Sequence, residues 1–137
     1  NGKINMVTKK DIENRDDIES FIIAFYEKVK KDNTIGIIFT DIVPMNWEHH
    51  IPLITDFWET IILDNPVYKN NAMEVHFKLN KLFPLHKKHF NAWLDLFNTT
   101  IDEMFTGDKT ELAKKRALSI AMVMEHKINN DQISIKE

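Results

Sequence analysis

Residues 47–58, WEHHIPLITDFW, carry the pattern that decides the fold. Apolar side chains recur there at steps of three and four residues and continue to Ile61 and Ile62, which is the spacing of one face of an α-helix. His50 falls on this apolar stripe, whereas the neighbouring His49 lies off it. Because Pro52 lacks a backbone N–H, we expect the helix of about residues 46–63 to bend or to start late.

Similar stripes predict further helices on both sides of this one. They cover residues 11–31, with Ile18, Phe21, Ile22, Phe25, Tyr26 and Val29; about 72–82, with Ala72, Val75, His76 and Leu79; 90–105, with Phe90, Trp93, Leu94, Phe97, Ile101, Met104 and Phe105; and 108–128, with Ala113, Ala117, Ile120, Ala121, Met124 and Ile128. Residues 35–43 form an apolar connection with Gly36 and Phe39. Reading Ile37-Ile38-Phe39 as a strand fails, because no second strand candidate could pair with it.

The composition favours one globular domain. The 137 residues are 43% hydrophobic and 28% charged, with only three Gly and four Pro, too few turn formers for many short strands. No repeat or linker divides the chain. Residues 1–137 are therefore expected to form a single all-α domain, with a core of about residues 11–128 and a tail at 129–137. The lack of cysteine excludes thiol catalysis, disulfides and thiolate metal sites.

Charge and hydropathy limit the partners that the sequence predicts. The net charge of −3 gives no reason to expect nucleic-acid binding. No apolar run approaches the roughly 20 residues of a membrane span, and the polar residues 1–10 are unlike a secretory signal. We therefore expect a cytoplasmic protein that binds neither nucleic acid nor membranes. The sequence leaves its oligomeric state open.

Four polar side chains on apolar stripes are the candidates for chemistry. His50 and His76 come from different predicted helices, and Tyr26 and Trp93 add a hydroxyl and an indole N–H. Each of them could be an ordinary core residue bonded to a nearby carbonyl. An unpartnered imidazole in a dry core costs about 1–3 kcal/mol, so both histidines need partners, which a ligand shared between the two helix faces would supply. Such a pocket could hold a flat apolar cofactor ligated by histidine.

Three motifs, in their order along the chain, resemble those of the truncated haemoglobins. They are Phe25-Tyr26-Glu27-Lys28-Val29; Trp47-x-x-His50-x-x-x-Ile54-x-x-Phe57-Trp58; and His76 followed by His89-Phe90-x-x-Trp93-Leu94-x-Leu96-Phe97. The match covers about residues 11–124. The third group of the family fits best, since the first two groups carry Gly-Gly pairs in their loops and the glycines here are isolated. One departure is Ile51-Pro52, where the family often has Leu-Pro.

The resemblance implies a two-over-two helical sandwich around one haem b. It implies that His76 is the proximal iron ligand and that Tyr26, His50 and Trp93 are the distal ligand contacts. Members of the group differ in whether the distal histidine faces the iron. The cofactor-binding positions that the resemblance implies are Phe25, Phe39, His50, Ile54, Phe57, Trp58, His76, Leu79, Phe90 and Trp93.

One basic run stands out from the mixed charge of the chain. It consists of Lys78, Lys81, His86, Lys87, Lys88 and His89. The simplest interpretation is a solvated helix end and loop. The alternatives are pairing with the haem propionates or contact with an acidic partner surface.

Three functions follow as hypotheses. The first is reversible binding of O₂ and other diatomic ligands at haem, with distal donors that contribute about 1–3 kcal/mol each and so slow ligand release. Slow release suits a sensor, scavenger or redox catalyst better than an oxygen-transport protein. The second is a haem-dependent redox enzyme acting on peroxide or nitric oxide, which would need an external reductase because the sequence contains no reductase domain. The third is a cofactor-free helical interaction module, in which the histidines and Tyr26 are core residues.

Overall fold

The computed structural model describes residues 9–42, 46–69, 80 and 84–136, and among these the side chains of all but Ile42 and residues 130–136. Four long helices make up most of this part of the chain. They are α1 (Arg15–Lys31), α2 (Trp47–Ile62), α4 (Lys87–Met104) and α5 (Asp108–Lys136). The described residues contain no β-strand, so the all-α prediction is confirmed. None of the described helices is long and apolar enough to cross a membrane.

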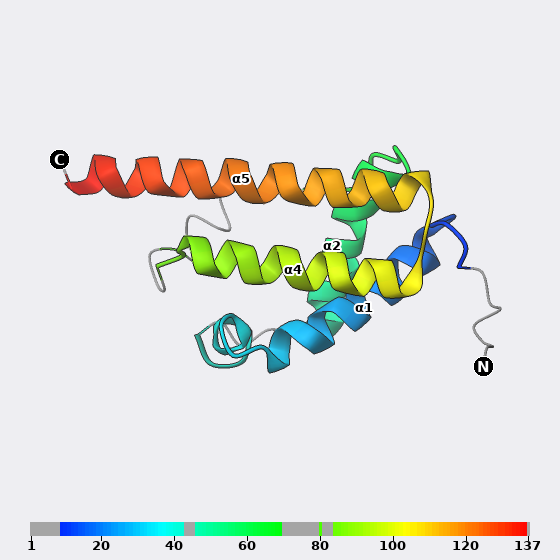
Figure 1. Cartoon of the computed structure of the whole chain (residues 1–137), viewed down its shortest axis with the longest axis horizontal. Helices are drawn as coiled ribbons and strands as arrows, with labels where there is room; N and C mark the ends of the chain where they lie inside the picture. The colour runs from blue at the N-terminus through cyan, green and yellow to red at the C-terminus, as the bar shows by residue number, and fades with distance from the viewer. Residues whose placement is uncertain (1–8, 43–45, 70–79, 81–83, 137) are drawn as a thin grey trace, which may run out of the picture.

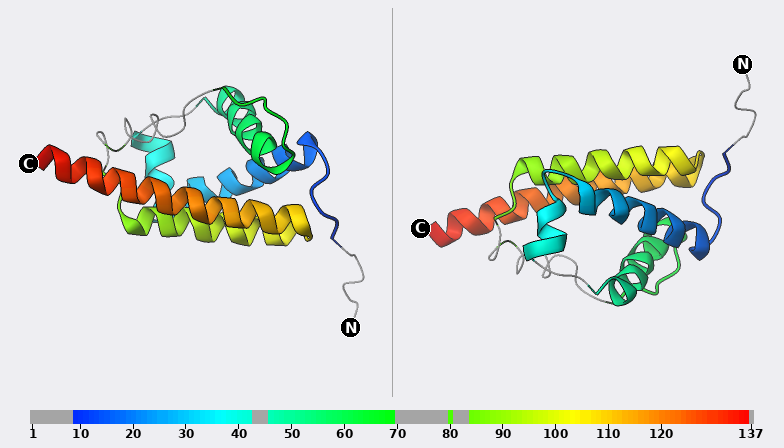
Figure 2. Two further views of the ribbon diagram at one scale, coloured as in Figure 1. Left: turned by 90° about the horizontal axis from the view of Figure 1, so that it is seen from above. Right: turned by 90° about the horizontal axis from the view of Figure 1, so that it is seen from below.

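The helices form two layers. Helices α4 and α5 run antiparallel, joined by a tight turn at residues 105–107 (Figure 1). Helices α1 and α2 cover one face of this pair, and α2 crosses it steeply (Figure 2). Helix α1 contacts both α2 and α4, while α2 also reaches α5. This arrangement is the two-over-two sandwich that the sequence resemblance implies.

Large apolar side chains hold the layers together. Phe21 and Phe25 of α1 are buried against Phe97 of α4, with ring centroids 4.9 and 5.6 Å away. Trp58 of α2 also packs against Phe97, with the ring centroids 4.9 Å apart. Burying one such aromatic side chain contributes about 1.5–3 kcal/mol, so this contact of three helices is a large part of the stability of the fold.

Helix α1 begins at Arg15, four residues later than its apolar pattern predicts. Its N-cap is Asn14, whose side chain accepts a hydrogen bond from the Asp17 N–H. Asp11 instead caps α5, because its carboxylate accepts from the backbone N–H groups of Lys109 and Thr110 at 2.8 and 3.0 Å. Gly107 makes room for this contact, since its φ is 141° and a Cβ there would lie 2.5 Å from the Asp11 carboxyl carbon.

Three further differences separate the observed helices from the predicted ones. Helix α2 starts at Trp47 and continues through Pro52, so the predicted late start is wrong. Pro52 removes only one backbone hydrogen bond, the one to the Glu48 carbonyl.

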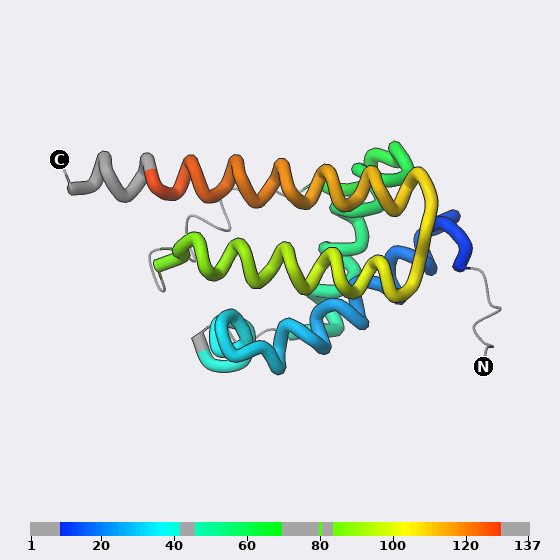
Figure 3. The backbone as a smooth tube through the Cα atoms, in the orientation of Figure 1, coloured from blue at the N-terminus to red at the C-terminus, as the bar shows by residue number. Residues whose placement is uncertain are grey.

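Residues 38–42 of the apolar connection form a π-helix as the chain curls back after α1 (Figure 3). Helix α5 extends to Lys136 instead of ending at Ile128 before a tail. The predicted short helix at about residues 72–82 lies outside the described residues, apart from Asn80.

Candidate functional site

Tyr26 is the centre of an aromatic group where α1, the π-helix and the start of α2 meet. Its ring centroid lies 5.6 Å from Phe39, 5.3 Å from Trp47 and 6.2 Å from the imidazole of His50. Phe25 completes the contact from α1 at 4.7 Å and connects it to Trp93 of α4 at 5.8 Å. We call this set the Tyr26 cluster, and its members are Phe25, Tyr26, Phe39, Trp47, His50 and Trp93.

The Tyr26 hydroxyl is kept neutral by its surroundings. The residue is 8% exposed, and burial raises its pKa to about 12. The Trp93 indole N–H donates toward the hydroxyl oxygen and lowers this pKa, but by less than burial raises it. At neutral pH, Tyr26 therefore retains an O–H that can donate a hydrogen bond within an apolar setting.

His50 is the second polar group of the Tyr26 cluster. It is half-buried one turn into α2, where its ring meets Trp47 edge-on at 5.6 Å. Burial lowers the pKa of His50, and the charge of His49 lowers it further. The imidazole is therefore neutral near pH 7, with one nitrogen as donor and the other as acceptor.

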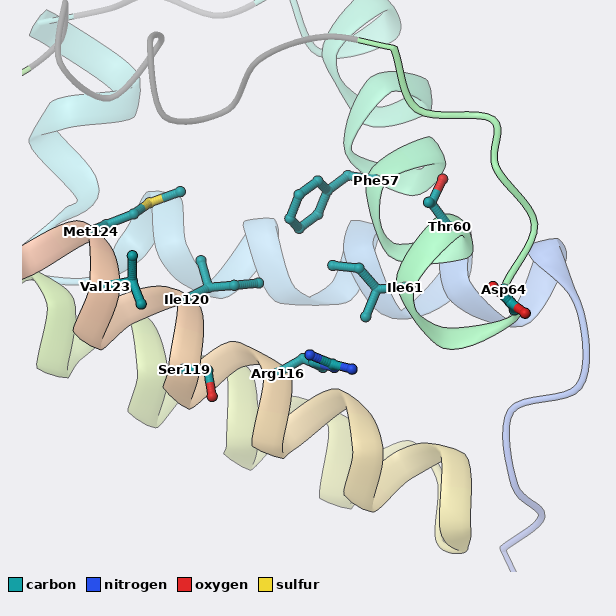
Figure 4. A pocket seen from close by; sticks show the side chains of 9 residues that line it. All are labelled: Phe57, Thr60, Ile61, Asp64, Arg116, Ser119, Ile120, Val123 and Met124. Atoms are coloured by element: carbon teal, nitrogen blue, oxygen red, sulfur yellow. The ribbon is translucent and has the colours of Figure 1, made fainter. Parts of the chain in front are cut away.

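A second feature is a cleft between α2 and α5 with a volume of about 460 Å³ (Figure 4). We call it the α2–α5 cleft. Figure 4 shows Phe57 and Ile61 of α2 and Ile120 and Met124 of α5 extending into the space between the helices. Its lining residues are Phe57, Thr60, Ile61, Asp64, Arg116, Ser119, Ile120, Val123 and Met124. Its size and largely apolar lining are those of a small-molecule pocket.

The other predicted pocket residues are divided between this cleft and the core. Phe57 lines the α2–α5 cleft, and Ile54 is half-buried on the same helix. Trp58 is 3% exposed and packs in the core against Phe97, so it lines neither this cleft nor the Tyr26 cluster. Phe90 is buried near the start of α4.

The predicted iron ligand, His76, and the neighbouring Leu79 lie outside the described residues. Among the residues that are described, no three His, Asp or Glu side chains cluster closely enough to hold a metal ion. The roles predicted for His76 and Leu79 therefore stay predictions.

The basic run is only partly a solvated helix end. Lys87 and Lys88 are exposed at the start of α4, and Lys87 Nζ lies 4.0 Å from a Glu125 carboxylate oxygen. His89 is buried, and its Nδ1 accepts a hydrogen bond from the His86 backbone N–H at 2.8 Å. Burial lowers the pKa of His89, with Lys88 and His86 adding to the effect, so His89 does not act as a solvated cation as the sequence predicts. Lys78 and Lys81 lie outside the described residues.

Sequence reasoning did not select several residues that the structure places at these features, among them Trp47, Ile120 and Met124. Trp47 belongs to the Tyr26 cluster, and its signal is the spacing of three residues that sets it on the same stripe as His50. Ile120 and Met124 line the α2–α5 cleft, although their stripe predicts core positions. The periodicity of a helix shows which side chains face inward, but it does not distinguish a filled core from an open cleft.

The chain has the fold of the truncated globins, and its resemblance to the group III truncated haemoglobins is confirmed. No protein-family model matches the sequence. Over 111 residues the chain is 28% identical to the group 3 truncated hemoglobin ctb of Campylobacter jejuni subsp. jejuni, covering 79% of this chain and 85% of the relative. The crystal structure of a group III truncated hemoglobin from Campylobacter jejuni superposes with a TM-score of 0.76 and 27% identity, over 88% of this chain and 95% of that one. These similarities support a globin role in binding a ligand at haem.

Proposed function

We propose that the protein binds haem b and, through it, reversibly binds O₂ or another diatomic ligand. The observation that carries the proposal is the buried, neutral Tyr26 hydroxyl beside His50 and Trp93, in a chain with the fold of the group III truncated haemoglobins. A cofactor-free interaction module gives no reason to gather three hydrogen-bonding side chains inside an aromatic cluster.

The described residues fit a haem. The α2–α5 cleft has a volume of about 460 Å³, and its apolar lining residues Phe57, Ile61, Ile120 and Met124 would hold the macrocycle by van der Waals contact. The lining also contains polar side chains, among them Arg116. The chain contains no cysteine, so it cannot form thioether bonds to the group, which favours a non-covalently held haem b. His76 is the residue proposed to ligate the iron. When bound, haem supplies an iron with one open coordination position for a diatomic ligand.

The residues of the Tyr26 cluster would act on that ligand from the distal side. The Tyr26 O–H is a donor at all physiological pH values because its pKa is about 12. Neutral His50 supplies a further N–H group, while the Trp93 indole, whose one N–H already donates toward the Tyr26 oxygen, would orient that hydroxyl. Each hydrogen bond to the ligand in this dry setting contributes about 1–3 kcal/mol and slows release accordingly. The rings of Phe25 and Phe39 exclude water and so preserve this strength.

Addition of haemin to the purified protein tests the proposal. We expect one equivalent to bind and to give an intense Soret band, and His76→Ala to change or abolish that band. His126→Ala is the matched control, since His126 is exposed on α5 and lines neither the cleft nor the cluster. No Soret band, or the same band in His76→Ala, would contradict the proposal.

A further inference from the structure

We propose that a surface cleft between α1 and α2 is the path by which an uncharged diatomic gas reaches Tyr26, and that the Trp47 ring closes its inner end. The inference rests on the proposed function, because it concerns how the ligand of that site arrives. It adds a residue, Trp47, that determines which ligands enter and how fast.

The path is a cleft of about 460 Å³, here called the α1–α2 cleft. Its lining residues are Glu19, Ile23, Tyr26, Glu27 and Lys30 of α1 and Trp47, Glu48, Ile51 and Pro52 of α2. It shares no lining residue with the α2–α5 cleft, so the two open at different places on the molecule. Tyr26 and Trp47 are the two members of the Tyr26 cluster that line it, and the α1–α2 cleft therefore ends at the proposed ligand contact.

The Trp47 ring lies between the α1–α2 cleft and the other members of the Tyr26 cluster. Trp47 is the first residue of α2, it is half-buried, and its ring touches Tyr26, Phe39 and His50 on the inner side. On the outer side, Lys30 Nζ lies 5.1 Å from the Trp47 ring centroid. Glu27 holds Lys30 in place through a 2.9 Å ion pair. Ion pairs and cation–π contacts at partly exposed positions contribute little free energy, so these two contacts would not prevent the Trp47 ring from turning.

The charges at the mouth of the α1–α2 cleft select its occupant. Three carboxylates, Glu19, Glu27 and Glu48, line the cleft together with one ammonium group, Lys30, which is already paired with Glu27. Lys31, outside the lining, also acts on Glu27 and adds to the effect of Lys30 in lowering the pKa of its carboxyl. Within the described residues, neither Glu19 nor Glu48 forms an ion pair. An excess of negative charge repels anions, whereas the apolar walls at Ile23 and Ile51 favour a small uncharged molecule. The occupant is therefore a neutral gas such as O₂, CO or NO.

Carbon monoxide rebinding to the haem-loaded protein after flash photolysis tests the role of Trp47. We expect Trp47→Ala to raise the bimolecular association rate at least fivefold, Trp47→Phe to raise it less, and Lys30→Met to raise it about twofold. Lys115→Met is the control, since Lys115 is exposed on α5 and lines neither cleft. An unchanged rate in Trp47→Ala with an intact Soret band would overturn the proposal, and a missing Soret band in the wild type would count against haem binding instead.

Xenon supplies a readout that needs no haem. With isoleucine methyl groups labelled in the full chain, we expect xenon pressure to shift the NMR signals of Ile23 and Ile51, and to shift them more in Trp47→Ala. Shifts confined to Ile61 and Ile120 would place the path at the α2–α5 cleft and overturn the proposal. This measurement remains decisive if a variant loses haem.

Azide binding to the ferric protein at low salt and pH 8 tests the selection by charge. In the double variant Glu19→Gln, Glu48→Gln we expect the azide association rate to rise several-fold while the carbon monoxide rate stays the same. An equal change for both ligands, or no change for azide, would show that the acidic mouth does not select the occupant.

Discussion

The two halves of α2 contribute to the proposed site in different ways. Its first half contributes Trp47 and His50 to the Tyr26 cluster, where neighbouring rings lie 4.7–6.2 Å apart. Its second half contributes Phe57 and Ile61 to the α2–α5 cleft, where about 460 Å³ is left between apolar side chains. Close contact fixes polar donors in place, whereas an open apolar cleft accepts a flat group. One helix can thus serve a haem site in two ways.

The largest effect on the free energy of unfolding should come from removing a ring of the Tyr26 cluster rather than a ring that lines the α2–α5 cleft. Phe25 is 1% exposed and lies between Tyr26, Trp93 and Phe97, so Phe25→Ala should lower the free energy of unfolding by about 3–5 kcal/mol. Phe57→Ala, which removes a half-buried ring from the edge of the cleft, should cost about 2 kcal/mol or less. Urea unfolding of the haem-free protein measures both. Equal losses would mean that the cleft is as closely packed as the cluster.

The second effect concerns the hydrogen bond that Tyr26 would donate to the bound ligand. Tyr26→Phe should speed O₂ dissociation by up to about a hundredfold, corresponding to about 1–3 kcal/mol. Because the pKa of Tyr26 is about 12, its contribution to the wild-type rate should stay constant between pH 6 and 10. Stopped-flow displacement of O₂ by carbon monoxide measures the rate. Tyr68→Phe is the control, since Tyr68 packs on Phe57 away from the cluster. An off-rate unchanged in Tyr26→Phe would remove Tyr26 from the ligand contacts.

A smaller effect, on the affinity for haem, should follow from filling the α2–α5 cleft. Ile120→Trp places an indole in the α2–α5 cleft and should weaken haem binding about tenfold, which corresponds to about 1.4 kcal/mol. The rate of haem loss to excess apomyoglobin reports this change. Leu118→Trp lies on the same helix, 47% exposed and outside the cleft, and should have no effect. If both variants hold haem like the wild type, the cleft is not the haem site.

The smallest expected effect is on the free energy of unfolding, and it comes from the ion pair between Arg15 of α1 and Glu59 of α2. Arg15 Nη1 lies 2.7 Å from a Glu59 carboxylate oxygen, and the Arg15 hydrogen bond is the main cause that lowers the pKa of Glu59. A lowered pKa in the folded state means that the stabilisation is present above the ordinary value of 4.5 and is lost as the pH falls through the folded pKa. Arg15 is 40% exposed, so Glu59→Gln should cost about 1 kcal/mol or less at pH 7.

Urea unfolding at several pH values checks this dependence. The difference between Glu59→Gln and the wild type should shrink below about pH 4. Asp95→Asn, at an exposed position of α4, is the control and should show no difference at either pH. A Glu59→Gln penalty that persists unchanged at low pH would show that the carboxylate charge is not its cause.

The sequence predicts which segments form the four long helices, and it places Tyr26, His50 and Trp93 on the apolar stripes of three of them, because both depend on local spacing. The stripe of α2 gives its boundaries to within a residue or two, and the same stripe brings His50 to the face that meets Tyr26. The confirmed resemblance to truncated haemoglobins also depends on short motifs in order. Local pattern is enough wherever helix periodicity decides which side chains face inward.

The remaining features depend on contacts between distant residues, which no local pattern contains. Asp11 caps α5 by accepting hydrogen bonds from Lys109 and Thr110, which lie 98 and 99 positions further along the chain. The apolar pattern of residues 11–31 alone would place Asp11 at the start of α1. The α2–α5 cleft lies between two helices that are far apart in the sequence, and Ile120 lines it although its stripe predicts core. Pro52 removes one backbone hydrogen bond from α2, to the Glu48 carbonyl, and the helix continues through it to Ile62, with Trp58 and Ile62 buried in the core.

The crystal structure of the haemin-loaded protein tests most directly whether the two regions form one site. The account predicts porphyrin density against Phe57, Ile120 and Met124 in the α2–α5 cleft, with the Tyr26 hydroxyl on the side of the iron opposite His76. Porphyrin density elsewhere on the chain, or a Tyr26 hydroxyl turned away from the iron's open position, would contradict it.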